Sequence, residues 1–566
     1  MRNKNNLTIQ SQAMTIFEKN TPMKNIVFIF TTFLITFSSQ AQRSKPPKLV
    51  VGIVVDQMCY EYLYRYQANF VEGGFNRFLK KGMNCRNTLY NYVPTFTGPG
   101  HASIYTGTTP SNHGIVGNDW YNRETQGNMY CVQDNSVATV GSSSKEGQVS
   151  PENLKTYTVT DQLKMTYPKA KVISMSIKDR GSILPGGHLS DGSYWYDYAT
   201  GTFITSTYFK KELPSWVSDF NASKNATTYT KTWELLLPKE RYSSVDESPY
   251  EVVLSGKTSA TFPYNFIEMG GGKASPKLFT TSPFANDLLT DFALEAIEKE
   301  GLGTDNQTDM MCISYSTPDI AGHAFGPYSL ELEDIYVRLD RDLKKLMDGL
   351  EKKYGKNGFT IFLTADHAVV PVPQMLVDKK MPGGYFYLNQ NMDDLRKSTI
   401  TEFGADLIEY EENLNIYLKH KRIDSLKLNR EAVAQFVATK VRTWKNVKVV
   451  FTAGELGQNT SSDNEWKDML RKGFELNRSG DVLFILEPGF LPMAKETDKS
   501  HKGTSHGSAF NYDSHVPLLW YGAGILPKDV FTPYDIIDIA PTLTHLLNLQ
   551  RSGAMTGKPI IEVLQK

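Results

Sequence analysis

Uninterrupted apolar runs are the feature of this 566-residue sequence that most limits its fold. Short runs of this kind are typical of strands that are buried on both faces, as in parallel sheets covered by helices. They occupy residues 48–55, 172–177, 311–316, 359–363, 482–486 and 516–521. Helical patterns lie between several of them, most clearly at 330–353. The alternation predicts an α/β fold with a mainly parallel central sheet that is flanked by helices and interrupted by inserted loop or cap regions.

Two stretches break this alternation. Residues 181–275 are rich in Gly, Ser, Thr, Tyr and Trp and have few long periodic runs, which predicts an excursion of loops and short strands. Residues 371–480 form a second excursion with helix and strand patterns of their own. We therefore expect a catalytic domain made of 48–370 and 481–566, which contains the first excursion. The second excursion, 371–480, is expected to be an inserted subdomain whose purpose the sequence does not give.

The amino-terminal region has the pattern of a secretory signal. A positively charged start at Met23 is followed by the apolar run 26–37 and by small and polar residues up to Ala41. This predicts a signal peptide at 23–41, cleaved after Ala41, because the run is too short for a comfortable permanent membrane span. Residues 1–22 have no such apolar core, so we expect translation to start at Met23 and these residues to be a non-native extension. The mature protein is then exported, to the periplasm in a Gram-negative cell or otherwise secreted, with no stable membrane anchor.

Composition argues against two classes of partner. Lys plus Arg and Asp plus Glu both number 61, so the formal net charge is zero and nothing marks a nucleic-acid-binding surface. No polybasic segment is present that would hold the chain to an anionic membrane. Four cysteines allow three pairings if all are bridged, and buried free thiols are an equal alternative. These are Cys59, Cys85, Cys131 and Cys312. The oligomeric state is left open, and a monomer is compatible with the sequence.

Polar residues of metal-binding types follow the apolar runs. They are three carboxylates and three imidazoles: Asp56, Asp319, His323, Asp366, His367 and His506. Asp319 and His323 are four residues apart, so one helical turn would bring both to the same face. Nitrogen and oxygen ligands suit zinc, and two zinc ions could clamp the attacking and leaving oxygens of a phosphoryl group. The pattern predicts two Zn²⁺ per chain, whereas the other histidines, His101 among them, show no such pattern.

A cluster of turn-forming residues at 94–101 contains two threonines. It joins an extended segment to a helix-compatible run, and Pro99 suits a first helical turn because its missing N–H would be unpaired there anyway. A hydroxyl just ahead of that helix faces free N–H groups and the positive end of the helix dipole, a place that favours phosphate. Thr97 lies nearer the helix start than Thr95. We expect Thr97 to be a nucleophile that metal coordination activates, and Thr95 to be a structural neighbour.

Six motifs together resemble the alkaline phosphatase superfamily, and most closely the phosphate-irrepressible alkaline phosphatases of bacteria, relatives of the nucleotide pyrophosphatase/phosphodiesterases. They are Val55-Asp-Gln57, Pro94-Thr-Phe-Thr-Gly-Pro-Gly-His101, Gly114-Ile-Val-Gly-Asn118, Asp319-Ile-Ala-Gly-His323, Thr364-Ala-Asp-His367 and Gly503-Thr-Ser-His-Gly507. The resemblance covers nearly the whole mature chain and implies that Thr97 is the nucleophile. It implies one zinc held by Asp319, His323 and His506. It implies a second held by Asp56, Asp366 and His367 with the Thr97 oxygen. Asn118 would donate a hydrogen bond to a phosphoryl oxygen.

A Lys-x-Arg pair, Lys178 and Arg180, distinguishes two branches of this family. The resemblance implies that such a pair reaches the phosphoryl oxygens in the monoesterases and is lacking in the diesterases. A monoester dianion carries one more negative charge than a diester. Arg180 can meet two oxygens bidentately, while Lys178 acts as a point charge.

We therefore expect hydrolysis of small-molecule phosphate monoesters through a phospho-threonine intermediate, with release of inorganic phosphate. The alternative is a phosphodiesterase or nucleotide pyrophosphatase with the same two zinc ions. A metal-binding pseudoenzyme is less favoured, because no ligand or candidate nucleophile is missing. A sulfatase is disfavoured because the Cys/Ser-x-Pro-x-Arg motif of that branch is absent. The physiological substrate and its leaving group are not given by the sequence.

Overall fold

The structure is a computed structural model that describes residues 46–458, 464–496 and 501–565. The expected amino-terminal extension at 1–22 and signal peptide at 23–41 lie outside the described residues. Among the described residues, no helix is both long enough and apolar enough to cross a membrane.

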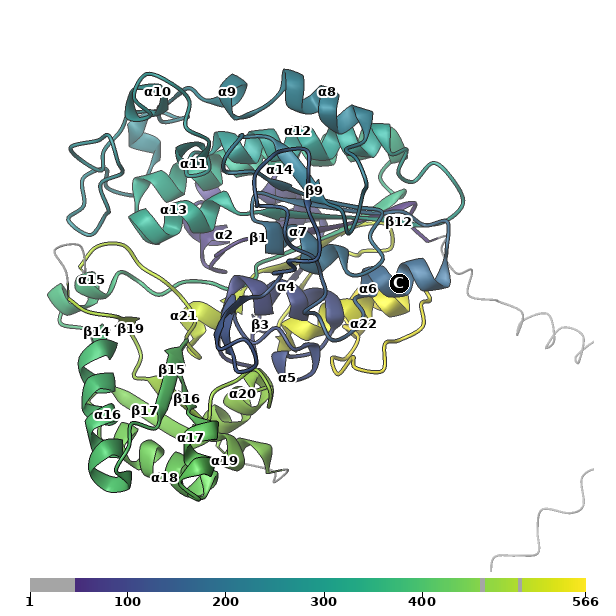
Figure 1. The fold of residues 1–566 in the computed structure, drawn as a ribbon. Helices are drawn as coiled ribbons and strands as arrows, with labels where there is room; N and C mark the ends of the chain where they lie inside the picture. The colour runs from purple at the N-terminus through teal and green to yellow at the C-terminus, as the bar shows by residue number, and fades with distance from the viewer. Residues whose placement is uncertain (1–45, 459–463, 497–500, 566) are drawn as a thin grey trace, which may run out of the picture. The chain divides into compact units, whose positions relative to one another are not determined.

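A ten-stranded sheet forms the centre of the described part of the chain (Figure 1). Its strand order is β22-β2-β21-β13-β1-β12-β7-β8-β9-β6. In that order the strands span Lys528–Val530, Met83–Cys85, Leu518–Gly522, Phe359–Thr364, Leu49–Val55, Asp309–Tyr315, Val172–Ser176, Gly192–Tyr196, Phe203–Ser206 and Thr139–Val140. The strands from β13 to β8 pair in parallel, whereas β21 and β9 join them in the antiparallel sense. The predicted α/β fold with a parallel central sheet is confirmed.

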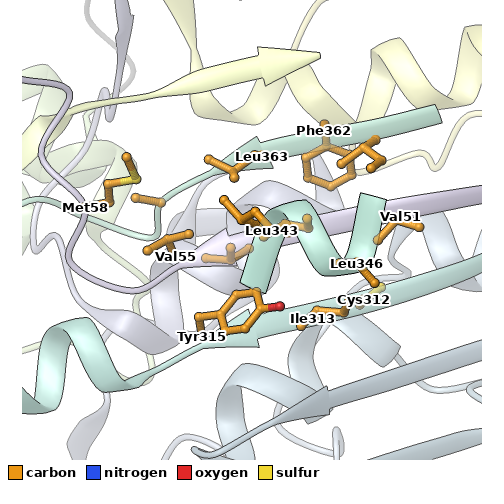
Figure 2. Packing of buried hydrophobic residues seen from close by; sticks show 14 of the residues in the cluster. Val51, Val55, Met58, Cys312, Ile313, Tyr315, Leu343, Leu346, Phe362 and Leu363 are labelled. Carbon is orange, nitrogen blue, oxygen red and sulfur yellow. The ribbon is translucent and has the colours of Figure 1, made fainter. Parts of the chain in front are cut away.

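Helices cover the central strands, so that these strands are buried on both faces. Every residue of β1, β12 and β13 is buried. On one face lie α12 (Phe284–Lys299) and α14 (Leu330–Tyr354), which pack against each other. Figure 2 shows Leu343 and Leu346 of α14 among the buried side chains of β1, β12 and β13. Burial on both faces requires apolar residues at successive positions, which explains the unbroken apolar runs in the sequence.

The carboxyl ends of the central parallel strands lie at one edge of the sheet. β1 pairs with β12 and β13, placing Val55 opposite Tyr315 and Val54 opposite Thr364. In sheets of this kind ligands bind outside the carboxyl ends of the strands. The register therefore delivers residues from three distant segments of the chain to one place.

A smaller four-stranded sheet is formed by residues from the second excursion and just after it. Its order is β15-β16-β18-β17, with strands at Ile408–Glu412, Asn415–Leu418, Val482–Leu486 and Val447–Thr452. Two helices, α16 (Leu388–Phe403) and α18 (Arg430–Val441), share a hydrophobic cluster with this sheet (Figure 1, green). The grouping of Val482–Leu486 with the strands of the catalytic domain is wrong, because β18 pairs antiparallel with β16 and β17. An apolar run indicates burial but does not identify the partner strand. The division into a catalytic domain and an inserted subdomain stays a prediction.

Two further expectations are refined. The first excursion contains short strands, as expected, and two of them, β8 and β9, extend the central sheet. The cysteines Cys59, Cys85, Cys131 and Cys312 are all buried free thiols. Of the two alternatives for the cysteines, the structure therefore has the unbridged one.

Candidate functional site

The residues expected to bind metal gather at the carboxyl edge of the central sheet. Asp56 directly follows β1, and Asp366 and His367 follow β13. Asp319 and His323 lie one turn apart in α13 (Thr317–Phe325), which comes after β12. The close parallel register of β1, β12 and β13 is what brings these side chains together.

One group of possible ligands consists of Asp56, Asp366 and His367. One ligand atom from each lies within 4.8 Å of the others. His367 Nε2 is 3.4 Å from Asp56 Oδ1 and 3.7 Å from Asp366 Oδ2, and all three side chains are fully buried. These three atoms have no hydrogen-bond partner in the described part of the chain. Buried polar atoms without partners are costly, so this donor set fits a metal ion.

A second group lies beside the first. Ligand atoms of Asp319, His367 and His506 also lie within 4.8 Å of one another. Asp319 Oδ1 is 3.2 Å from His323 Nε2 and 3.5 Å from His506 Nε2. The rings of His367 and His506 stack with their centroids 3.4 Å apart. The expected trio of Asp319, His323 and His506 is therefore assembled, with His367 between the two groups. Which ligands belong to which ion stays a prediction.

Backbone carbonyls orient the three histidine rings. The Nδ1 atoms of His323, His367 and His506 lie 2.9, 3.0 and 2.8 Å from the carbonyl oxygens of Thr504, Ala368 and Thr95. Because a carbonyl can only accept, Nδ1 carries the hydrogen in each neutral ring and Nε2 presents its lone pair to the centre. This is the usual support of a metal-binding histidine.

Burial sets the charge state of the first group. Burial raises the pKa of Asp56 well above its ordinary value, and the charges of Asp319 and Asp366 add to the effect. Burial also raises the pKa of Asp366 to about 6. It lowers the pKa of His367 to about 3, so that ring is neutral and able to bind a cation. Divalent cations would reverse the penalty on the carboxylates.

Helix α4 (Thr97–Thr106) begins at the expected nucleophile. Phe96 precedes it in an extended conformation and offers no side-chain cap, and Thr97 is the first helical residue. The first-turn N–H groups of such a helix favour anions. Gly100 permits a close approach to the ligand segment, since a Cβ there would lie 2.3 Å from the carbonyl oxygen of Asp366. Thr97 therefore begins a helix that closely approaches the candidate ligand Asp366 at Gly100.

The side chains of Asn118 and Thr95 form different hydrogen bonds. The Oδ1 atom of Asn118 accepts a hydrogen bond of 2.7 Å from the backbone N–H of Gly98. Since its oxygen is used in this way, its amide N–H groups are the part left to donate to an anion at the start of α4. Thr95 Oγ1 donates to the carbonyl of Ser508 at 2.9 Å, which agrees with its expected structural role.

The ammonium group of Lys178 lies between the two ligand groups. Lys178 precedes α7 (Asp179–Gly186), and its Nζ donates to Asp56 Oδ2 at 2.7 Å and to Asp319 Oδ2 at 2.5 Å. Burial opposes its charge, but Asp319 and Asp56 outweigh burial and raise its pKa. A cation at the centre was expected from the sequence, whereas its hydrogen bonds to the ligand carboxylates were not. Its contact with a phosphoryl oxygen stays a prediction.

Arg180 is held by its neighbours at the same edge. Its Nη1 donates to Tyr130 Oη at 3.1 Å, and Tyr130 Oη donates to Asp179 Oδ1 at 2.5 Å. The Nε atom of Arg180 has no hydrogen-bond partner among the residues that the structure describes. A positioned guanidinium with an unused N–H is suited to bind an anion.

Gln57 supports the centre and was missed as a functional residue by the sequence reasoning. Its Nε2 donates to Asp319 Oδ1 at 2.6 Å, and its backbone N–H donates to Asp366 Oδ1 at 3.1 Å. It thereby links one ligand from each group. The only feature of the sequence that could have indicated this role is the position of Gln57 directly after Asp56.

His101 also lies at the centre, although the sequence analysis gave it no role. Its Nδ1 donates to the Thr97 carbonyl at 2.9 Å and lies 3.3 Å from Asp366 Oδ2. Burial lowers its pKa to about 4, so the ring is neutral, and its Nε2 accepts from the Ser314 hydroxyl at 2.9 Å. His101 therefore links α4 to β12 through hydrogen bonds to Thr97 and Ser314, and its ring lies close to the candidate ligand Asp366.

The fold and the centre define a class of protein. A parallel sheet that carries two groups of candidate metal ligands near a helix N-terminus is suited to metal-dependent phosphoryl transfer. Residues 50–509 match the family described as type I phosphodiesterase / nucleotide pyrophosphatase. The match spans most of the chain, so the protein belongs to this family.

Similar proteins show which branch of the family this chain resembles most. Alkaline phosphatase PafA of Elizabethkingia meningoseptica is 42% identical over 529 residues, covering 92% of this chain and 94% of that protein. Alkaline phosphatase PhoV of Synechococcus elongatus is 41% identical over 523 residues, covering 92% of this chain and 93% of that protein. The crystal structure of wild-type PafA has a TM-score of 0.87 at 41% identity, covering 92% of this chain and 99% of that one. A second crystal structure is that of a PafA mutant in which a threonine, an asparagine, a lysine and an arginine are replaced. It has a TM-score of 0.86 at 39% identity, covering 91% of this chain and 99% of that one. The chain is a PafA-like member of the alkaline phosphatase superfamily.

Proposed function

We propose that the protein is an alkaline phosphatase, a metal-dependent hydrolase of small-molecule phosphate monoesters that acts through a phospho-threonine at Thr97. The observation that carries this proposal is the convergence of two ligand groups, a helix beginning at Thr97, and the cations of Lys178 and Arg180 at one sheet edge. The similarity to PafA and PhoV supports it. Neither nucleic acid nor a membrane is proposed as a partner.

The metals of this proposal are two Zn²⁺ ions. One is held by Asp319, His323 and His506. The other is held by Asp56, Asp366 and His367 with the Thr97 oxygen. Bound zinc ions would favour the deprotonated nucleophile and neutralise charge on the phosphoryl oxygens. The unpaired ligand atoms of Asp56, Asp366 and His367 support this assignment.

The remaining chemistry belongs to side chains of this chain. Thr97 Oγ1 forms a bond to phosphorus while the bond from phosphorus to the leaving oxygen breaks, and water then cleaves the phospho-threonine to release phosphate. Asn118 directs an amide N–H to a phosphoryl oxygen, because its Oδ1 is held by Gly98. Arg180 and Lys178 stabilise the charge on the nonbridging oxygens, where preorganised donors contribute most.

Replacement of the nucleophile tests this proposal. Thr97→Ala should lower kcat/KM for phenyl phosphate by roughly 1,000-fold or more, because the residue that becomes phosphorylated is lost. Zinc content, measured by elemental analysis, should stay close to that of the wild type. The matched control is Thr95→Ala, two residues away, which should keep most of the activity. Undiminished turnover by Thr97→Ala would contradict the mechanism.

A phosphodiesterase or nucleotide pyrophosphatase is the second candidate, since the matching family carries that description. The two functions differ in the charge of the substrate, and Lys178 and Arg180 supply the matching positive charge. We expect the wild type to prefer phenyl phosphate over methyl phenyl phosphate. Lys178→Ala should lower monoester hydrolysis by roughly 100-fold, and diester hydrolysis by much less. A wild-type preference for the diester would favour the second candidate.

Export is part of the proposal. We infer that residues 23–41 are a signal peptide and that the mature protein acts in the periplasm or outside the cell. Amino-terminal sequencing of the mature protein should begin at Gln42. A precursor that begins at Met1 would contradict the inferred start at Met23.

A further inference from the structure

A cavity of about 260 Å³ adjoins the candidate metal centre and has no part in the chemistry proposed above. It is lined by Phe96, which directly precedes the proposed nucleophile, and by His506, a candidate metal ligand. Asp119, which directly follows Asn118, lines it as well. The cavity therefore borders the place where we expect the phosphoryl group to bind.

Packing fixes the part of the cavity wall that belongs to the centre. The rings of Phe96 and His506 form a T-shaped pair with their centroids 5.5 Å apart. Gly507 permits this arrangement, since a Cβ there would lie 2.5 Å from a carbon of the Phe96 ring. The His506 ring is also held by the Thr95 carbonyl, 2.8 Å from its Nδ1. A wall that is already in place costs a ligand little ordering on binding.

Other parts of the wall come from the smaller sheet region and the strand that follows it. Leu414, in the turn between β15 and β16, lines the cavity, as does Leu491 of β19 (Phe490–Met493). The turn is tied to the centre because Asn413 Nδ2 donates to the Asp119 carbonyl at 2.9 Å. The cavity is therefore built jointly by the segments around the centre and by the smaller region.

Apolar side chains predominate in the lining, and its charged side chains have one sign. Among the described residues that line the cavity none is Lys or Arg, whereas four are acidic: Asp119, Glu411, Glu412 and Glu487. Lys448, from outside the lining, pairs with Glu487 at 3.3 Å. Burial raises the pKa of Glu411 to about 7, so this carboxyl is ionised at alkaline pH. The lining suits an uncharged apolar group and disfavours an anionic one.

We propose that this cavity holds the leaving group of the substrate and thereby selects phosphate monoesters of apolar, uncharged alcohols, such as aryl phosphates with an extended ring system. The inference rests on the proposed function, because it requires phosphoryl transfer to Thr97. The group bonded to the leaving oxygen then lies along Phe96 and His506 and buries apolar area in the cavity. Each further buried carbon adds to binding, so kcat/KM should rise with the apolar size of the leaving group until the cavity is full.

Turnover of 2-naphthyl phosphate and phenyl phosphate at alkaline pH tests the proposal, since the two esters differ mainly by one apolar ring. The metal-loaded wild type should have a kcat/KM roughly tenfold higher for 2-naphthyl phosphate. Leu414→Ala and Leu491→Ala remove parts of the apolar wall, so each should reduce this preference to roughly threefold and change phenyl phosphate turnover little. A carboxylate on the far ring, as in 6-carboxy-2-naphthyl phosphate, should lower the wild-type kcat/KM because the lining is acidic.

Leu428→Ala is the matched control. Leu414 and Leu428 are both half-buried and pack against the same hydrophobic cluster, but Leu428 is not among the residues that line the cavity. This variant should keep the wild-type preference for 2-naphthyl phosphate. Equal kcat/KM values for the two esters in the wild type would overturn the proposal. An undiminished preference in both Leu414→Ala and Leu491→Ala would overturn it as well.

Binding of 2-naphthol separates this inference from the proposed function. This compound is the leaving group without its phosphate, so calorimetric titration measures occupation of the cavity in the absence of turnover. The wild type should bind it, and Leu414→Ala should bind it roughly fivefold more weakly. An active phosphatase that does not bind 2-naphthol would overturn the assignment of the cavity alone. A wild type that binds 2-naphthol through Leu414 but hydrolyses neither ester would instead contradict the proposed function.

Discussion

His113 shows at the scale of one residue how burial fixes a charge state. Its Nδ1 accepts from the Ile115 backbone at 3.1 Å, and its Nε2 lies 2.9 Å from Ser103 Oγ. Burial, assisted by Arg478, lowers its pKa to about 3. An unfolded histidine has a pKa of about 6.5. Below that pH the unfolded chain therefore binds a proton that the folded chain does not, and the contribution of His113 to stability falls as pH falls.

We expect the stability difference between the wild type and His113→Asn to depend on pH. The free energy of unfolding of the wild type, relative to the variant, should fall by about 1.4 kcal/mol per pH unit between about pH 6 and pH 4. Other titrating groups act in both proteins and cancel in the difference. Denaturant unfolding of both proteins at several pH values measures it. A difference that is independent of pH would show that His113 is not held neutral.

At the scale of elements, the packing of α4 against the segment after β13 depends on Gly100. A Cβ at this position would lie 2.3 Å from the Asp366 carbonyl oxygen and 2.8 Å from the Asp366 Cβ, so backbone would have to move. Alanine ordinarily favours a helix over glycine by about 1 kcal/mol. Gly100→Ala should nevertheless lower the Tm and the amount of bound metal, because it displaces a candidate ligand. Thermal unfolding and elemental analysis measure both.

A second helical glycine provides the comparison. In Gly349→Ala, the new Cβ would meet only the Cδ2 atom of Leu294 at 2.7 Å, the end of a flexible side chain. This variant of α14 should bind as much metal as the wild type and change the Tm little. If Gly100→Ala behaved in the same way, the close approach of α4 to Asp366 would not be essential.

The elements nearest the centre could be predicted from the sequence because their patterns are local. β1, β12 and β13 are unbroken apolar runs, and Asp56 and Asp366 follow two of them. The partner of β18 could not be predicted, since an apolar run is compatible with either sheet. The role of Gln57 was also out of reach, because it joins residues 262 and 309 positions away through hydrogen bonds that only tertiary packing creates. Local pattern therefore located the candidate ligands, but not the side chains that hold them.

At the scale of the whole described molecule, polar contacts connect the smaller sheet region with the central sheet region. Asp481, beside β18, forms an ion pair with Arg123 at 2.9 Å. Asn413, in the turn between β15 and β16, donates to the Asp119 carbonyl at 2.9 Å. Asp119 is next to Asn118, so the smaller region contacts the segment that carries a proposed phosphate-binding residue. Stability and activity should therefore both depend on this connection.

Arg478 makes the connection that is most open to test. Its Nη1 donates to the carbonyls of Gly114 and Asn153 at 2.5 and 2.7 Å, and its guanidinium lies 4.8 Å from the centre of the Trp120 ring. Arg478→Met would keep much of the apolar stem but leave two partly buried carbonyls unpaired, at a cost of about 1–3 kcal/mol each. We expect a lower Tm and, because Gly114 begins the segment that ends at Asn118, a lower kcat. Arg422→Met, at an exposed position of α17 (His420–Ser425), should change neither. Calorimetry measures the Tm of the two variants, and phenyl phosphate kinetics measure their kcat. An unchanged Tm and an unchanged kcat in Arg478→Met would show that neither stability nor activity depends on this contact.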